Sequence, residues 1–432
     1  MNYRQKTCAF LEKNGLFPGN LDFTGLTESF IREMENGLSG KSSLKMIPTY
    51  IQASTLRPAG KNIIVLDAGG TNFRAALLSF DHEGKADISH FGKYPMPGTR
   101  GILTKNEFFR EMAELIEKTV PLTESVAFCF SYPSEILPNR DGRLIHFCKE
   151  VKAPEVENTL IGESLKAALQ ERGYKISGNI IILNDTVATL LGGIYSGGSR
   201  RFSSYIGLIL GTGTNTCYIE KGAAIKKIRS FSDMIINIES GAYDQAPRGA
   251  LDLALDERTE TPGQHVFEKM ISGAYLGPLV LLAVKQAAEE GLFTSGAAAG
   301  INRISSLETA DLDCFLNYPF EQNRKLASED FTDHDRSTFY IIAGQIIERA
   351  AFLTAANISA AVLKTGAGTD PDLPVCIAAE GTTFFSLKNL RFLTEYYCRK
   401  YLTGHYQRFI EIIRPENSTL IGTALAGLEG SR

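Results

Sequence analysis

The chain has 432 residues, of which 44% are hydrophobic and 22% charged, and its formal net charge is −4. This length suggests two domains with a sizeable core, and the composition is ordinary for a globular protein. The weak negative charge gives no sign of a surface for nucleic acids or anionic membranes, so neither is expected as a partner.

The cysteines and the N-terminal residues indicate the compartment. The seven cysteines form no CxxC pair, which predicts neither a disulfide framework nor a zinc site. The first residues do not show the charged and then apolar pattern of a signal peptide. The apolar run at 278–284 is too short to span a bilayer. We therefore expect a reducing, cytoplasmic location.

The first half of the chain predicts an α/β fold. Helices broken by turns near Asn14 and Gly37 are expected up to residue 50. From 62 to about 185, apolar strands alternate with amphipathic helices, which is typical of α/β proteins. The expected strands are 63–66, 75–80, 125–131 and 180–184, and the expected helices are 107–118 and 160–172.

The second half continues this alternation. Strands are expected at 205–210, 217–220 and 375–379, and a loop rich in Gly and Pro at 364–374. Long helices are expected at 264–291 and 339–363. The segment 339–363 is alanine-rich and apolar on most faces, which predicts a helix buried in a domain core.

The segment Asn62–Arg74 is the most informative motif. An apolar strand runs into Asp67, the turn Gly69-Gly70-Thr71-Asn72 follows, and the chain returns as a second strand. Adjacent glycines let backbone N–H groups approach a polyphosphate, and an aspartate at the strand end can hold hydrated Mg²⁺ opposite it. The alternative is a tight hairpin without a ligand.

A similar unit recurs at Gly211-Thr-Gly-Thr-Asn215, between two further apolar strands. Two such units are expected when two similar α/β halves each lend one hairpin to the same nucleotide. Gly381-Thr382, after a third strand, could wrap the sugar or base of the nucleotide, or could be a plain turn.

Asn184 and Asp185 stand at the carboxyl end of a hydrophobic strand, where α/β folds open onto their ligand crevice. An aspartate there can accept a hydroxyl proton in phosphoryl transfer while Asn184 orients the alcohol. We expect it to act with an ordinary pKa, already ionised at neutral pH. The structural alternative is N-capping of a helix by Asp185 or Thr186. Ser131 lies near a second strand mouth, whereas Glu239 and Glu268 are unremarkable by spacing alone.

In this order, the motifs resemble the eukaryotic-type hexokinase family, which has the two-lobed actin-like (RNase H-like) ATPase fold, with small and large α/β domains around a cleft. The resemblance extends from about residue 60 to Ala426. It rests on the blocks 66–74, 130–133, 184–189, 206–220, 236–239, 262–264, 267–277 and 422–426.

The resemblance implies ATP-dependent phosphorylation of the 6-hydroxyl of a hexose, with glucose most expected, as the entry step of glycolysis. Asp185 would be the general base and Lys149 would face the γ-phosphate. The hexose would contact Ser131, Cys148, Lys149, Asn184, Asp185, Asn215, Glu239, His265 and Glu268. ATP would contact Asp67, Gly69, Gly70, Thr71, Asn72, Arg74, Gly211, Thr212, Gly213, Thr214, Gly381 and Thr382, and Asp67 would hold Mg²⁺ through water.

The resemblance also implies a domain division. The small domain would comprise 51–183 and 419–432, and the large domain 1–50 and 184–418. Hexose and MgATP are the expected partners, and the protein would be a monomer or a homodimer.

Three departures from the family pattern fall on the sugar side. Cys148 replaces a threonine, His265 replaces a glutamine, and Ser240 replaces a tryptophan. They favour weaker or broader sugar binding, so a kinase of another hexose, such as mannose or fructose, is the main alternative. Two further functions compete with hexose phosphorylation: a sugar sensor without turnover, and an actin- or Hsp70-like ATPase.

Overall fold

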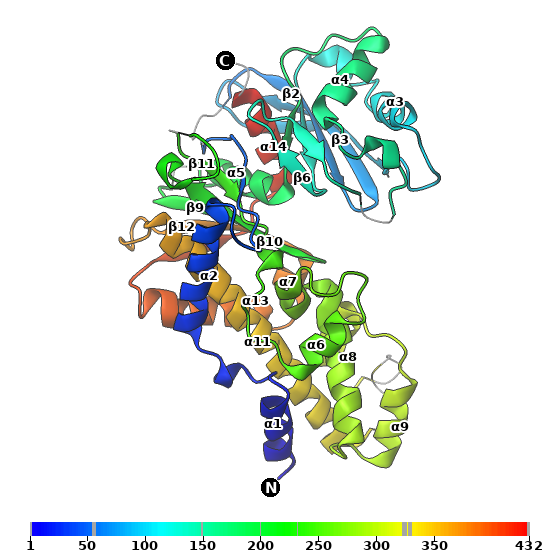
Figure 1. The fold of residues 1–432 in the computed structure, drawn as a ribbon, viewed down its shortest axis with the longest axis vertical. Helices are drawn as coiled ribbons and strands as arrows, with labels where there is room; N and C mark the ends of the chain where they lie inside the picture. The colour runs from blue at the N-terminus through cyan, green and yellow to red at the C-terminus, as the bar shows by residue number, and fades with distance from the viewer. Residues whose placement is uncertain are drawn as a thin grey trace.

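The computed structural model describes residues 2–53, 58–147, 150–198, 200–230, 232–321, 326 and 331–429. The chain forms two lobes, each built around one β-sheet, with the helix Tyr3–Lys13 at the far end of the lower lobe and the helix Ser418–Glu429 in the upper lobe (Figure 1). This two-lobed α/β architecture agrees with the prediction. The bounds proposed for the two domains stay a prediction.

The upper lobe contains a five-stranded sheet in the order β4-β3-β2-β5-β8. Strands β2, β5 and β8 are parallel, whereas β3 is antiparallel to both of its neighbours. Alternate residues of β2 enter different cores: Ile64 and Leu66 pack with α3 and α4, and Ile63 and Val65 pack with α14. The bounds are β2 Asn62–Gly69, β3 Asn72–Phe80, β4 Ala86–Pro95, β5 Val126–Phe130, β8 Ile181–Leu183, α3 Lys105–Leu115 and α4 Ile161–Glu171, with a small hairpin of β6 Ser134–Ile136 and β7 Gly142–Leu144.

The lower lobe contains a six-stranded sheet in the order β1-β11-β10-β9-β12-β13. Its strands β9, β12 and β13 are parallel, and β9, β10, β11 and β1 form antiparallel pairs. The bounds are β1 Ile47–Pro48, β9 Ser204–Leu210, β10 Thr214–Glu220, β11 Met234–Asn237, β12 Val375–Glu380 and β13 Ile410–Ile413.

The long helix α11 (Asp333–Thr365) forms the centre of the lower lobe and is buried from Ile346 to Val362 apart from Glu348. Its length and hydropathy would suffice to cross a membrane, but 89% of its apolar window is buried inside the protein. The prediction of a buried core helix is therefore confirmed. Around it and below it lie α1 Tyr3–Lys13, α2 Phe23–Leu38, α6 Ala250–Asp256, α7 Val266–Ile271, α8 Gly273–Glu289, α9 Ser295–Arg303, α10 Thr309–Asn317 and α13 Leu390–Tyr397 (Figure 1).

Two helices join the lobes. Helix α5 (Asp185–Ser196) packs on the six-stranded sheet, α14 (Ser418–Glu429) packs on the five-stranded sheet, and the two helices pack on each other. Their approach is so close that a Cβ at Gly422 would lie 1.8 Å from the carbonyl oxygen of Ala188. Only glycine fits there, and the α5–α14 layer fixes where the first residue of α5 lies.

Most predicted elements are confirmed, but one expected helix is divided and several short or edge strands were not expected. The helix expected at 264–291 is divided at Ser272, because the N–H groups of Gly273 and Ala274 donate to the carbonyls of Gly211 and Thr212, at 2.8 and 3.0 Å. Strand β4 was not expected, since it is a largely exposed edge strand without an apolar pattern.

Candidate active site

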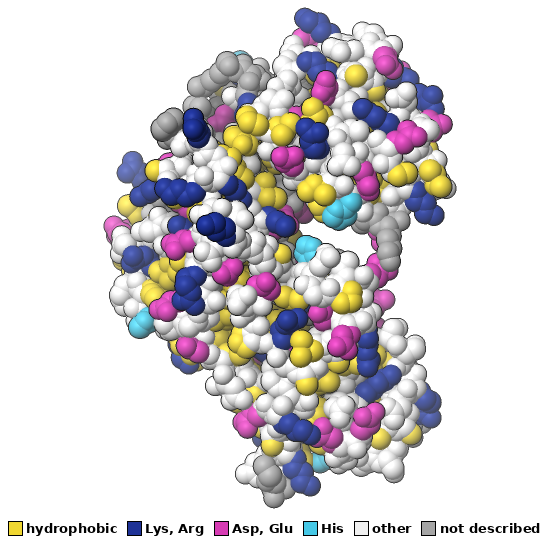
Figure 2. All heavy atoms as spheres, in the orientation of Figure 1, with side chains coloured by type: hydrophobic (Ala, Val, Ile, Leu, Met, Phe, Trp, Pro, Cys, Tyr) yellow, Lys and Arg dark blue, Asp and Glu magenta, His cyan; other side chains and the backbone are white. Residues whose placement is uncertain are grey.

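The carboxyl ends of five strands face the region between the lobes. In the upper sheet, β2 ends in Gly69, and β5 and β8 lead into Ser131 and Asn184. In the lower sheet, β9 and β12 run in parallel and lead into Gly211 and Gly381. Because parallel strands present these ends along one edge, residues distant in the sequence converge. Figure 2 shows the hollow between the two lobes.

The first predicted hairpin is formed by β2 and β3, with Gly70 and Thr71 at its exposed turn. The turn is held in place by Tyr132, whose hydroxyl donates to the carbonyl of Gly70 at 2.7 Å. Arg74 and Asp67 face each other across the hairpin at 3.3 Å between Nη1 and Oδ2. The motif is therefore a hairpin, but one whose side chains line a pocket.

The second predicted hairpin, β9–β10, turns at Gly211, Thr212 and Gly213. Glu268 of α7 closes it, since its Oε2 accepts from the Thr214 N–H at 2.9 Å. A Cβ at Gly213 would lie 2.6 Å from the same carboxylate oxygen, so the close approach of Glu268 depends on that glycine. The glycine turn of this hairpin thus contacts Glu268, a carboxylate that the sequence predicted on the sugar side.

Asp185 is the first residue of α5, directly after β8. The N-cap is Asn184, whose Oδ1 accepts from the Thr186 N–H at 2.9 Å, so the interpretation of Asp185 or Thr186 as the cap is wrong. The carboxylate Oδ1 of Asp185 accepts from the same N–H at 2.8 Å. Capping of α5 and a role for Asp185 in the cleft are therefore compatible.

One small pocket, of about 210 Å³, is lined by residues of both lobes. Asp185 and Ser131 lie in it together with the first hairpin. It is lined by Asp67, Gly69, Asn72, Arg74, Ser131, Asp185, Ile209, Glu380, Gly381 and Thr419. The sequence motifs that predicted phosphate binding and base catalysis therefore meet in one cavity.

A network of amides and carboxylates adjoins this pocket. The Nδ2 group of Asn215 lies 3.3 Å from Asn184 Oδ1, 2.8 Å from Asn237 Oδ1 and 3.3 Å from Glu239 Oε1. Asn237 Nδ2 also donates to Glu239 Oε1, at 2.7 Å. Glu239 has a left-handed backbone with φ of 59°, a conformation that residues with a Cβ rarely adopt. These contacts orient acceptors and donors as a polyol would need.

The carboxylates of the cleft are costly to ionise. Burial, with the nearby charge of Asp67, raises the pKa of Asp185 to about 7. Burial likewise raises the pKa values of Asp67, Glu239 and Glu268. The expectation of an ordinary pKa at Asp185 is therefore wrong, because the sequence does not reveal how many carboxylates share this cleft.

His265 directly precedes α7, and its imidazole interacts electrostatically with the carboxylate of Glu239. The residue is exposed, yet surrounding protein desolvates the imidazole and lowers its pKa, against the opposing effect of the Glu239 charge. The two other predicted sugar-side residues, Cys148 and Lys149, lie outside the described residues.

The structure adds residues that sequence reasoning missed. A pocket of about 890 Å³ extends from Gly211 and Thr212 to Thr382, at the start of α12 (Thr382–Ser386), so Gly381-Thr382 is not a plain hairpin turn. This pocket is also lined by Gly273, Ala274 and Thr309; the first two fall in the block 267–277, but the sequence assigned a site role to none of the three. The sequence did contain signals for two other residues of the site. Asn237 lies two residues before Glu239, and Glu380 is an acidic residue at the end of a strand before a glycine turn, a pattern similar to that of Asp67.

Comparisons with known proteins agree with this geometry. A family model described as Hexokinase matches residues 205–428, and a second with the same description matches residues 20–195. Hexokinase-1 of Schizosaccharomyces pombe is 30% identical over 78% of this chain and 74% of its own length. Hexokinase-1 of Spinacia oleracea is 27% identical over 93% of this chain and 86% of its own length.

Solved structures confirm the actin-like fold. A hexokinase from Schistosoma mansoni, complexed with glucose, has a TM-score of 0.78 at 22% identity and covers 99% of this chain and 100% of its own. A further hexokinase crystal structure has a TM-score of 0.76 at 21% identity, over 99% of both chains. Since the family models together cover both lobes and the yeast relative matches most of the chain, the protein belongs to the hexokinase family and is a hexose kinase.

Proposed function

We propose that the protein transfers the γ-phosphate of ATP to the 6-hydroxyl of a hexose, preferentially glucose, with Asp185 as general base. The observation that carries this proposal is the place of Asp185, in one 210 Å³ pocket with Asp67, Arg74 and Ser131. A hydroxyl bound beside Asp185 would face a phosphate held by the hairpins. Entry of hexose into glycolysis would be the metabolic role.

Asp185 would accept the hydroxyl proton as the hexose oxygen attacks the γ-phosphorus and ADP leaves. A general base works best when its pKa lies near the working pH, and burial raises the pKa of Asp185 to about 7. At neutral pH a large fraction of the carboxylate is then ionised and is a stronger base than an exposed aspartate. Burial thus favours proton transfer while leaving the base available.

The hexose would be held by the polar side chains around Asn215. Asn184, Asn215 and Glu239 already form one hydrogen-bonded group, and Glu268 is fixed on Thr214. Carboxylates are strong acceptors for sugar hydroxyls, and amides supply both donors and acceptors. Ser131 and His265 would complete this side of the cleft.

The nucleotide would lie along the two glycine hairpins, with its adenosine in the 890 Å³ pocket beside Thr382. That pocket has an apolar wall with Leu255, Pro278 and Leu281, suited to a base, and leads to Gly211 at its phosphate end. Gly381 lies next to Gly211, since a Cβ at Gly211 would be 3.6 Å from the Gly381 Cα. Backbone N–H groups of both hairpins would receive the phosphates.

Asp67 would hold Mg²⁺ through water. Its carboxylate lines the small pocket with a side chain 13% exposed, and a single oxygen-donor residue suits an ion that keeps its waters and binds nucleotide phosphates. When bound, the ion would neutralise charge on the phosphate oxygens.

The test is a panel of glucose, mannose and fructose with MgATP, following ADP release and the position of the phosphate on the sugar. Wild type should convert glucose with the highest kcat/KM, and Asp185→Ala should lose roughly 1,000-fold in kcat, as expected for loss of a general base. Unchanged turnover by Asp185→Ala would refute the mechanism. Sugar binding without ADP release would identify a sensor, and ATP hydrolysis independent of sugar would identify an ATPase.

A further inference from the structure

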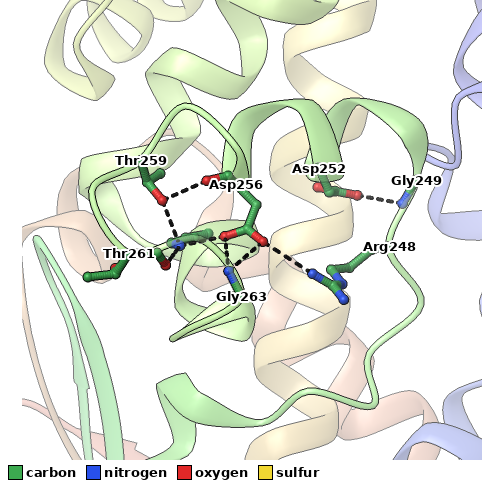
Figure 3. Close-up of polar contacts among 8 residues, drawn as sticks. Arg248, Gly249, Asp252, Asp256, Thr259, Thr261 and Gly263 are labelled. Carbon is green, nitrogen blue, oxygen red and sulfur yellow. Dashed lines mark hydrogen bonds and ion pairs between the residues drawn. The ribbon is translucent and has the colours of Figure 1, made fainter.

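The loop between α6 and α7 ends at His265, whose imidazole interacts electrostatically with Glu239, and it has no regular structure of its own. Residues 260–265 are exposed, so little apolar packing holds them. Beneath the loop lies a buried ion pair, in which Lys269 Nζ is 2.5 Å from Asp256 Oδ1 and the two side chains are only 3% and 10% exposed. Figure 3 shows Asp256 at the centre of these contacts.

The ion pair binds the loop at three places. Lys269 Nζ also donates to Thr259 Oγ1 at 2.8 Å and to the Thr261 carbonyl at 2.7 Å, so all three ammonium donors have acceptors. Asp256 accepts from the Gly263 N–H with both oxygens, at 2.9 and 3.1 Å. The loop backbone is therefore fixed by two side chains rather than by secondary structure.

The end of this loop is strained. His265 has φ of 50° and ψ of 38°, a left-handed conformation that a residue with a Cβ adopts only where its surroundings require it. The following helix presents Glu268 to the β9–β10 hairpin and Lys269, the next residue, to Asp256. One short helix thus carries a sugar-side carboxylate and the cation that anchors the loop.

We propose that Asp256 and Lys269 are positioning residues of the hexose site: their ion pair holds residues 259–265 and α7 so that His265 and Glu268 meet the sugar. This inference rests on the proposed function, because it takes both residues to contact hexose. Since those contacts would involve hydroxyls that do not react, their loss should weaken hexose binding in the ground state and transition state alike.

The experiment uses the full chain with Asp256→Asn and, separately, Lys269→Met, at saturating MgATP and varied glucose. We expect the KM for glucose to rise about tenfold, since displacement of a binding group by about 1 Å can cost up to about 100-fold. The kcat and the KM for MgATP should change less than about twofold. A rise in the KM for MgATP alone would overturn the proposal, because Leu255, Arg258 and Thr259 of the same turn line the nucleotide pocket.

Asp252→Asn is the matched control. Asp252 lies on the same helix and forms an equally buried ion pair with Arg349, at 2.6 and 2.7 Å, but it contacts α11 instead of the loop. It should lower the melting temperature and leave the KM for glucose unchanged. An equal rise in KM for Asp252→Asn would mean that general loss of stability explains the effect, which also overturns the proposal.

Glu268→Gln separates this inference from the proposed function. If Glu268→Gln raises the KM for glucose and a folded Asp256→Asn does not, the positioning role is wrong and the hexose site stands. If neither variant raises it, the hexose site itself is wrongly assigned. Should Lys269→Met fail to fold, Thr259→Val removes one acceptor of Lys269 near the surface and should raise the KM by a smaller factor; an unchanged KM in both Thr259→Val and Asp256→Asn contradicts the proposal.

Discussion

The two sides of the cleft are built differently. The proposed phosphate side consists of the β2–β3 and β9–β10 hairpins with Gly381 and Thr382, so each part is a continuous stretch of sequence with glycines at its turn. The proposed hexose side consists of Ser131, Asn184, Asn215, Glu239, His265 and Glu268, which come from five separate segments, with His265 and Glu268 both at the start of α7. The phosphate side depends on the local backbone conformation of its turns, whereas the hexose side depends on side chains that the whole fold brings together.

The two sides also differ in electrostatics. The phosphate side presents Arg74 to the solvent, with 46% of its side chain exposed. Burial raises the pKa values of three carboxyl groups on the proposed hexose side and its base, namely Asp185, Glu239 and Glu268, but of only one on the phosphate side, Asp67. Substitutions should therefore affect the substrates separately, and the hexose side should be the more sensitive, because its charges are less screened by water.

The largest difference between the effects on glucose and on MgATP is expected for Glu239→Gln. Loss of a buried charged acceptor should lower kcat/KM for glucose about 100-fold and leave the KM for MgATP unchanged. Glu220→Gln is the control, because Glu220 is buried at the other end of β10, where it accepts from Tyr218, far along the strand from Asn215. If Glu239→Gln raised the KM for MgATP as much as that for glucose, the two sides would not be separable.

Arg74→Met should give the converse and smaller effect. Removing a cation that faces the phosphates should raise the KM for MgATP about tenfold with the KM for glucose unaffected. Arg143→Met is matched in exposure, with 45% of its side chain accessible, and pairs with Glu135 in the β6–β7 hairpin. Equal kinetics for the two arginine variants would remove Arg74 from the phosphate side.

His265→Gln should have a modest effect on the hexose side. Restoring an amide with both a donor and an acceptor should lower the KM for glucose about two- to threefold. Because desolvation lowers the pKa of His265, any change of the wild-type KM with pH should lie towards the acidic end of the range from about 5.5 to 7.5. If the KM for glucose were the same in wild type and His265→Gln and also did not change with pH, a contact between His265 and the sugar would be excluded.

The smallest effect concerns stability. The pKa of Asp185 is raised from 3.8 to about 7, so between these values the folded state binds more protons than the unfolded state. Stability therefore falls as pH rises through this window, by up to about 4 kcal/mol at pH 8. Asp185→Asn should be inactive yet melt a few degrees above wild type at pH 8, with a smaller difference at pH 5. A lower melting temperature for Asp185→Asn at pH 8 would contradict the cost of burying this charge.

The same contrast explains what could be predicted from sequence. The strands, the hairpins and the position of Asp185 after β8 were predictable, because apolar runs and glycine turns are local signals. The roles of Glu239 and Glu268 followed only from family resemblance, since a single glutamate has no local signature. The raised pKa of Asp185 and the Lys269–Asp256 support of the loop were not predictable, because both depend on which side chains the fold buries together.

The central claim is that ionised Asp185 takes the proton of the hexose hydroxyl. Its most direct test is the pH dependence of kcat/KM for glucose between about pH 5 and 9, with saturating MgATP. The account predicts a tenfold fall per pH unit below an apparent pKa of about 7, and an inflection that His265→Gln leaves in place. A profile that is flat down to pH 5.5, or an inflection that moves with His265, would contradict it.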